Sequence, residues 1–191
     1  MSENTYRYIP LFCEENIWQL ASTLLEQGRP LQEVDVVVLS NPQGHVAIRS
    51  QKAVPEGEYM VWDYHVILVD RGAGQVYDFD SRLPFPARLS EYLSATLPDV
   101  ARVLPEFIPE FRVVPAADYL AHFCSDRGHM KGVVPESEFP EWPAIRCEGL
   151  NRPVPLARYR DPGQDIPGSA CLGQKQFVDY CLDRDPETAS K

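Results

Sequence analysis

The sequence predicts a single α+β domain in which an N-terminal helix packs on an antiparallel sheet. Apolar residues with helical spacing follow Cys13, and several β-like runs lie between residues 34 and 80. The length of 191 residues fits one compact domain better than two. A chain of this size buries roughly 70% of its unfolded surface, so it needs neither a disulfide nor a metal to hold its core. We therefore expect residues 1–191 to form one domain.

The first predicted element is a helix that starts near Cys13. Glu14 and Glu15 would occupy its first turn, where they suit the positive end of the helix dipole. Gly28 fits the position after the helix, and Pro30 prevents continuation. Residues four and seven apart form its apolar stripe: Ile17, Ala21 and Leu24.

Strand-like runs come next, bounded by turn residues. The turn at residues 71–74 joins two of these runs into a hairpin. After the hairpin, Leu89, Leu93 and Leu97 predict a short helix, and Pro115 opens a further helical segment. The predicted strands cover residues 34–40, 45–49, 59–69, 75–80 and 111–114.

Proline is abundant, with 18 residues in the chain, and it is concentrated toward the C-terminal half. Proline lacks an N–H group and fixes φ, so a proline-rich stretch is typical of irregular structure. We therefore predict an irregular wrap over about residues 132–168. A last helix at about 174–182 should dock through Phe177 and Cys181.

Charge excludes several classes of function. The formal net charge is −10 and there is no basic cluster to meet phosphates, so we expect neither nucleic-acid nor membrane partners. No apolar run approaches the ~18–20 residues that span a bilayer. Residues 1–7 lack the basic and apolar segments of a secretory signal. We expect a cytoplasmic monomer.

Five cysteines occur at irregular spacing, and without a secretory signal we expect them to stay reduced. The nearest approach to a metal site is His122, Cys124 and His129, whose spacing fits no common zinc site. We therefore predict no metal and no cofactor. One cysteine could instead serve as a nucleophile. The five are Cys13, Cys124, Cys147, Cys171 and Cys181.

The predicted hairpin brings a histidine and a carboxylate together. If its tight turn is at Gly72-Ala73, residues whose numbers sum to 145 face each other. His65 then lies opposite Asp80 and diagonal to Asp78. A shift of two residues would make Asp78 the direct partner, so spacing leaves both open. On the other face, one apolar surface forms from Val66, Leu68, Tyr77 and Phe79.

A cysteine at a helix start beside this histidine would complete a thiol hydrolase. A carboxylate fixes the tautomer of the imidazole, and the helix end and an imidazolium both lower the pKa of the thiol. Glu14 and Glu15 act in the opposite direction. The alternative interpretation is structural, with His65 in a satisfied polar pair and Cys13 filling the core.

Several segments together resemble the protein N-terminal glutamine amidohydrolases. The resemblance implies a papain/transglutaminase-like core and a catalytic triad of Cys13, His65 and Asp78, with Asp78 chosen over Asp80. It implies a hydrolase that converts an N-terminal glutamine to glutamate through a thioester and releases ammonia. Its partners would be polypeptides with a free N-terminal glutamine, and in eukaryotes the product enters an N-degron pathway. The similar segments are 13–18, 62–66, 77–86, 111–113 and 125–131.

Such an enzyme must recognise a free α-ammonium group. Of the carboxylates near the site in sequence, Asp63 is favoured, with Glu14, Glu15 and Asp80 as alternatives, and Trp62 and Tyr64 could form a wall of the pocket.

The segment 125–131 either borders the cleft or is braced by Asp126 and Arg127, and we favour bracing. Competing functions are another thiol hydrolase or acyl transferase of the same core, and a non-catalytic domain that binds peptide N-termini.

Overall fold

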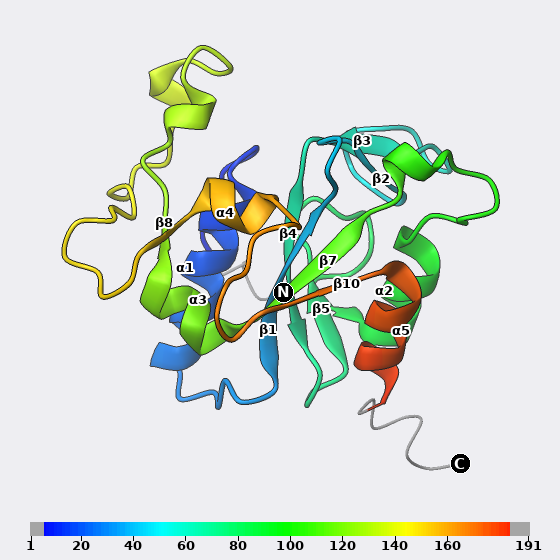
Figure 1. Ribbon diagram of the computed structural model, residues 1–191, viewed down its shortest axis with the longest axis horizontal. Helices are drawn as coiled ribbons and strands as arrows, with labels where there is room; N and C mark the ends of the chain where they lie inside the picture. Colours follow the sequence, from blue (N-terminus) through cyan, green and yellow to red (C-terminus); the bar gives the residue numbers. More distant parts are fainter. Residues whose placement is uncertain (1–5, 184–191) are drawn as a thin grey trace.

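The computed structural model describes residues 6–183, which form a mixed α+β structure around one antiparallel sheet (Figure 1). The strand order is β10-β7-β1-β4-β5-β6, and each neighbouring pair is antiparallel. The six strands are β1 (Val34–Ser40), β4 (His65–Asp70), β5 (Gln75–Tyr77), β6 (Ala87–Arg88), β7 (Glu110–Pro115) and β10 (Ala170–Leu172).

Helices cover both faces of this sheet, as Figure 1 shows. On one face lie α1 (Cys13–Glu26), α3 (Ala116–His122) and α4 (Leu156–Arg160); on the other lie α2 (Leu89–Thr96) and α5 (Gln174–Leu182). Strand β1 therefore contributes alternate side chains to two cores. Val36 and Val38 pack with α1, and Val37 and Leu39 pack with α2 and α5. A strand buried on both faces explains the continuous apolar run 36–39.

The N-terminal helix forms as predicted. It begins at Cys13, buries Ile17, Ala21 and Leu24, and is followed by Gly28 with a φ of 78°. The predicted C-terminal helix is also confirmed. Phe177 and Cys181 of α5 are buried, and Phe177 stacks on Phe111 of β7 with ring centroids 4.2 Å apart.

The hairpin has the predicted register, since Leu68 pairs with Tyr77 and Asp70 with Gln75. Two predicted strand bounds were wrong. The run 59–69 breaks after Trp62, because β3 (Met60–Trp62) turns away to pair with β2 (Val46–Ile48). The returning strand ends at Tyr77 rather than residue 80, because the Asp80 N–H bonds to the side chain of Asp78, 3.0 Å away, instead of to a strand.

The proline-rich wrap is more structured than predicted. It contains α4, whose Leu156 and Tyr159 are buried, and β9 (Val154–Pro155), which pairs in parallel with β8 (Phe123–Cys124). The expectation of fully reduced cysteines was wrong, because a disulfide joins Cys124 to Cys147. The described residues also contain three 3₁₀ turns: η1 (Pro105–Phe107), η2 (Gly128–Met130) and η3 (Glu136–Glu138).

Among the described residues, no helix combines the length and apolar character needed to cross a membrane. The predicted absence of a secretory signal concerns residues 1–7, of which 1–5 lie outside the described part of the chain.

Candidate active site

Cys13 occupies the first position of α1. The residue before it, Phe12, caps the helix without a side-chain hydrogen bond, and its carbonyl accepts the Asn16 N–H at 2.9 Å. The first N–H groups of a helix have no acceptor within the helix. The Cys13 sulfur therefore lies beside backbone donors that an oxyanion could use. The Asn16 side chain holds the preceding segment through the backbone of Ile9, at 3.0 and 2.7 Å.

His65 and Asp78 form a buried pair in which Nε2 lies 2.9 Å from Oδ1. Asp78 is further held by Gln51 Nε2 at 3.1 Å, the Tyr92 hydroxyl at 2.8 Å and the Asp80 N–H at 3.0 Å. Because a carboxylate accepts hydrogen bonds, Nε2 carries the proton in this pair. His65 Nδ1 has no hydrogen-bond partner in the described residues. The geometry thus leaves a basic nitrogen free.

Cys13 and His65 line one cavity of about 310 Å³. Trp62, at the end of β3, lines it too and stacks on His65, with ring centroids 5.4 Å apart and planes 15° from parallel. This cavity, which we call the reaction cavity, therefore holds a thiol, a base and an aromatic wall. Its other lining side chains are Leu11, Met60, Val61, Asp63, Tyr64, Asp80, His129, Met130, Val133 and Arg160.

Electrostatics set the resting protonation of these groups. Burial, and then the charges of Glu14 and Asp80, raise the pKa of the Cys13 thiol, against a backbone hydrogen bond from Val66 that lowers it. Of the two opposing effects expected from the sequence, the one that raises the pKa of the thiol, which includes the charge of Glu14, therefore prevails. Burial alone lowers the pKa of His65, but the charge and hydrogen bond of Asp78 outweigh it and raise that pKa above 6.5.

The pKa of Asp78 shifts in the opposite direction to that of His65. Burial would raise the pKa of its carboxyl group, but the charge of His65 and the hydrogen bonds from His65, Gln51 and Tyr92 lower it to about 2. Asp78 is thus ionised at neutral pH, and it can stabilise a proton on His65.

The two glutamates after Cys13, Glu14 and Glu15, are both buried, but they have different partners. Glu15 accepts two hydrogen bonds from Arg127, at 2.8 and 2.7 Å, and one from Trp142 Nε1 at 2.8 Å. It therefore forms a structural ion pair with Arg127 and is not available to bind a substrate. Glu14 accepts the Tyr64 hydroxyl at 2.9 Å, and its other oxygen, 3.4 Å from His129 Nε2, makes no hydrogen bond within the described residues.

Asp63 lies at the reaction cavity with an exposed carboxylate, which accepts a hydrogen bond from Arg160 at 2.8 Å. The guanidinium of Arg160 also lies over the ring of Tyr64, 4.2 Å from its centroid. Asp80 accepts the Tyr8 hydroxyl at 2.7 Å. The structure therefore brings Asp63 and Trp62 together at the cavity. Glu14 lies behind Cys13 and does not line the cavity.

The segment 125–131 has both of its predicted roles. Arg127 braces it through Glu15, and Asp126 accepts the Gly128 N–H at 2.8 Å. His129 and Met130 line the reaction cavity. The roles of Gln51 and Tyr92 as partners of Asp78, and of Arg160 as part of the cavity, were not predicted, because none of these residues lies in a motif that signals such a role.

The disulfide disfavours a metal at His122, Cys124 and His129, because it removes the Cys124 thiolate as a ligand. Elsewhere, ligand atoms of His65, Asp78 and Asp80 lie within 4.8 Å of one another. A cation bound there would compete with the hydrogen bond between His65 and Asp78.

Comparison with known proteins gives a consistent result. The profile of a family described as N-terminal glutamine amidase matches residues 8–177. The protein N-terminal glutamine amidohydrolase of Danio rerio is 38% identical over 134 residues, which cover 68% of this chain and 66% of that protein. The human one is 38% identical over 128 residues, covering 65% and 62%. The Arabidopsis thaliana one is 37% identical over 140 residues, covering 69% and 63%. The matches thus span just under two thirds of these relatives' length.

Proposed function

The chain belongs to the N-terminal glutamine amidase family, and on that premise we propose that it hydrolyses the side-chain amide of a polypeptide's N-terminal glutamine. The products are N-terminal glutamate and ammonia. The observation that carries the proposal is the reaction cavity, which is lined by both Cys13 and His65, a histidine whose Nε2 is held by the buried carboxylate of Asp78. The same arrangement supports a papain/transglutaminase-like core.

In the first half of the reaction, Cys13 attacks the δ-carbon of the glutamine side chain. His65 Nδ1 takes the thiol proton as the sulfur–carbon bond forms, because this nitrogen is the unoccupied one. Backbone N–H groups at the start of α1 stabilise the oxyanion. The imidazolium then gives its proton to the leaving nitrogen, the carbon–nitrogen bond breaks, ammonia departs, and a γ-glutamyl thioester remains.

In the second half of the reaction, water hydrolyses the thioester. His65 removes a proton from the water as its oxygen attacks the thioester, and the sulfur–carbon bond breaks. The proton returns from the imidazolium to the Cys13 sulfur, which regenerates the thiol. Asp78 stabilises the imidazolium in both halves, since it stays ionised at neutral pH.

Recognition of the first residue rests on charge and shape. Asp63, whose exposed carboxylate lies at the cavity and pairs with Arg160 through Oδ2, attracts the α-ammonium group, and Glu14 adds negative potential from behind Cys13. Trp62 forms the wall against which the aliphatic part of the glutamine packs. An acetylated N-terminus lacks the charge that these carboxylates attract, so it should bind poorly.

The test uses three peptides that differ only at the N-terminus: free glutamine first, N-acetylglutamine first, and glutamine second. Mass spectrometry and ammonia release report conversion, and added amine tests for acyl transfer. Cys13→Ala should abolish conversion. Cys171→Ala is the matched control, because Cys171 is also a free, partly exposed cysteine but does not line the reaction cavity.

Conversion of the first peptide alone, without incorporation of the amine, supports the proposed function. Near-normal conversion by Cys13→Ala would remove the thioester mechanism. Equal conversion of the acetylated peptide would remove α-ammonium recognition. Incorporation of the amine in place of water would instead indicate an acyl transferase.

A further inference from the structure

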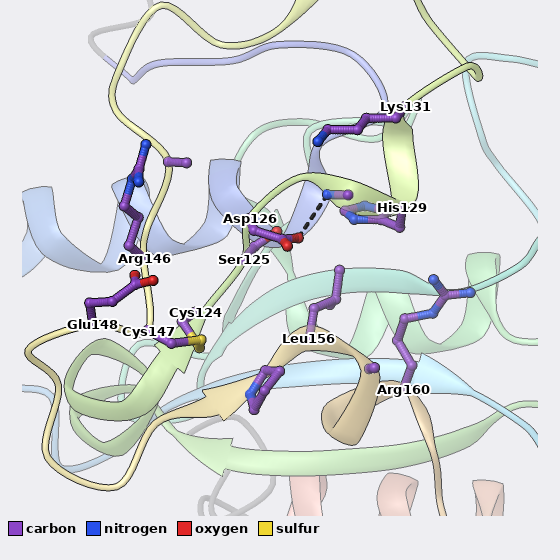
Figure 2. A pocket seen from close by; sticks show the side chains of 14 residues that line it. Cys124, Ser125, Asp126, His129, Lys131, Arg146, Cys147, Glu148, Leu156 and Arg160 are labelled. Atoms are coloured by element: carbon purple, nitrogen blue, oxygen red, sulfur yellow. Dashed lines mark hydrogen bonds between the residues drawn. A yellow bond between two sulfur atoms is a disulfide. The ribbon is translucent and has the colours of Figure 1, made fainter.

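A second, larger cleft of about 620 Å³ adjoins the reaction cavity. Its walls come from residues 124–131, 144–148 and 155–160, so we call it the disulfide cleft after the Cys124–Cys147 bond in its lining. His129 and Arg160 line both spaces and form the boundary between them. Figure 2 shows these two side chains at one end of the cleft and Arg146 with Glu148 at the other.

The proposed reaction requires such a second space. A reaction cavity of about 310 Å³ suits one residue, but a polypeptide continues from the α-carbonyl of that residue. The chain must therefore leave the cavity over one of its borders. The disulfide cleft shares the border at His129 and Arg160, whereas Cys13 lines the reaction cavity and does not line the cleft.

The lining of the cleft matches an extended peptide. Its apolar floor includes Leu156, and polar groups for backbone amides come from Ser125 and Asp126 (Figure 2). Lys131 and Arg146 are exposed and make no ion pair within the described residues. A cleft with both apolar and hydrogen-bonding groups suits a polypeptide better than it suits a purely apolar or purely anionic ligand.

One other space competes for this role. A smaller hollow of about 290 Å³ lies at residues 41–44 and also borders Asp63 and Arg160. The ion pair between Asp63 and Arg160 lies at the border between this hollow and the reaction cavity. The disulfide cleft has about twice the volume and is fixed by a covalent bond across its lining.

We infer that the disulfide cleft binds the residues that follow the N-terminal glutamine of a polypeptide substrate. This inference rests on the proposed function and adds to it where the substrate lies beyond its first residue. The cleft gives the enzyme a lower KM for polypeptides than for short derivatives of glutamine. Binding energy from this remote segment lowers KM without taking part in the chemical step.

The test compares a hexapeptide and a dipeptide amide that both begin with glutamine. Ala144→Trp narrows the disulfide cleft, and Ala144 does not line the reaction cavity. Gln43→Trp narrows the competing hollow and is the matched control. We expect Ala144→Trp to raise KM for the hexapeptide about tenfold at unchanged kcat, with the dipeptide amide unaffected, and Gln43→Trp to change neither.

Titration calorimetry of hexapeptide binding to Cys13→Ala, with and without Ala144→Trp, gives the same comparison without turnover. Weaker hexapeptide binding only in the Ala144→Trp protein supports the inference. Equal binding in both, or a loss caused by Gln43→Trp instead, overturns it. Failure of the wild type to convert either peptide would contradict the proposed function, whereas conversion of both peptides with equal KM would contradict only the role of the cleft.

Discussion

The indole of Trp62 lies parallel to the imidazole of His65, with ring centroids 5.4 Å apart. The two residues belong to strands of different sheets, because β3 pairs with β2 and β4 pairs with β1 and β5. Their rings meet because the chain breaks between them at Asp63 and Tyr64. With Trp62 against its face and Asp78 on its Nε2, the His65 ring has one orientation, and its Nδ1 has no hydrogen-bond partner among residues 6–183.

The first prediction concerns Asp78→Asn and the pH dependence of activity. In the proposed mechanism neutral His65 is the base, so kcat/KM should rise as pH passes the pKa of His65, which Asp78 raises above 6.5. Removing the charge of Asp78 should lower kcat by about 10²- to 10⁴-fold and move this limb to lower pH. Steady-state kinetics between pH 5 and 9 would measure both effects. A limb that stays in place in the variant would show that another group titrates.

The second prediction concerns acid stability. The pKa of Asp78 falls from 3.8 to about 2 on folding, so its stabilising contribution is fully present above 3.8 and is lost as pH falls through 2. The contribution amounts to about 2 kcal/mol of unfolding free energy. Urea unfolding of wild type and Asp78→Asn should therefore converge as pH decreases from 5 to 2. A difference that is constant over this range would contradict the shifted pKa.

The third prediction concerns the buried ion pair of Glu15 and Arg127. Arg127→Met leaves the Glu15 carboxylate buried without its cation, which should cost about 3–5 kcal/mol of unfolding free energy. The double variant with Glu15→Gln should recover part of that loss, because no buried charge remains. Denaturant titration measures the cycle. Lys175→Met, which breaks the exposed pair with Asp179, is the control and should have no measurable effect. Equal losses in Arg127→Met and Lys175→Met would refute the buried-charge explanation.

The fourth prediction concerns the Cys124–Cys147 disulfide, which spans a sequence separation of 23. Closing a loop of this length stabilises the fold by roughly 2–4 kcal/mol. A thiol titration of the denatured, unreduced protein should count three free cysteines, and reductant should raise the count to five. Reductant should also lower the melting temperature. Five thiols before reduction would show that the bond does not form.

Much of the site was predictable because it depends on local spacing. The helix start at Cys13 follows from the apolar repeat and Gly28, and the hairpin register follows from the turn at 71–74. Proximity of His65 to a carboxylate could be predicted in the same way. Spacing could not choose between Asp78 and Asp80, because that choice depends on where β5 ends and on what holds the carboxylate afterwards; only the family resemblance indicated Asp78.

By itself, the sequence determined a helix that presents Cys13 at its first turn and a hairpin that presents His65 beside an acid, since both depend on residues within one element or one turn. Only the tertiary structure decided what fixes them. Glu15 meets Arg127 across a separation of 112 residues, and Gln51 and Tyr92 reach Asp78 from a loop and a helix on either side of it in sequence. Such contacts depend on how the elements pack, and local patterns of residue types do not predict that packing.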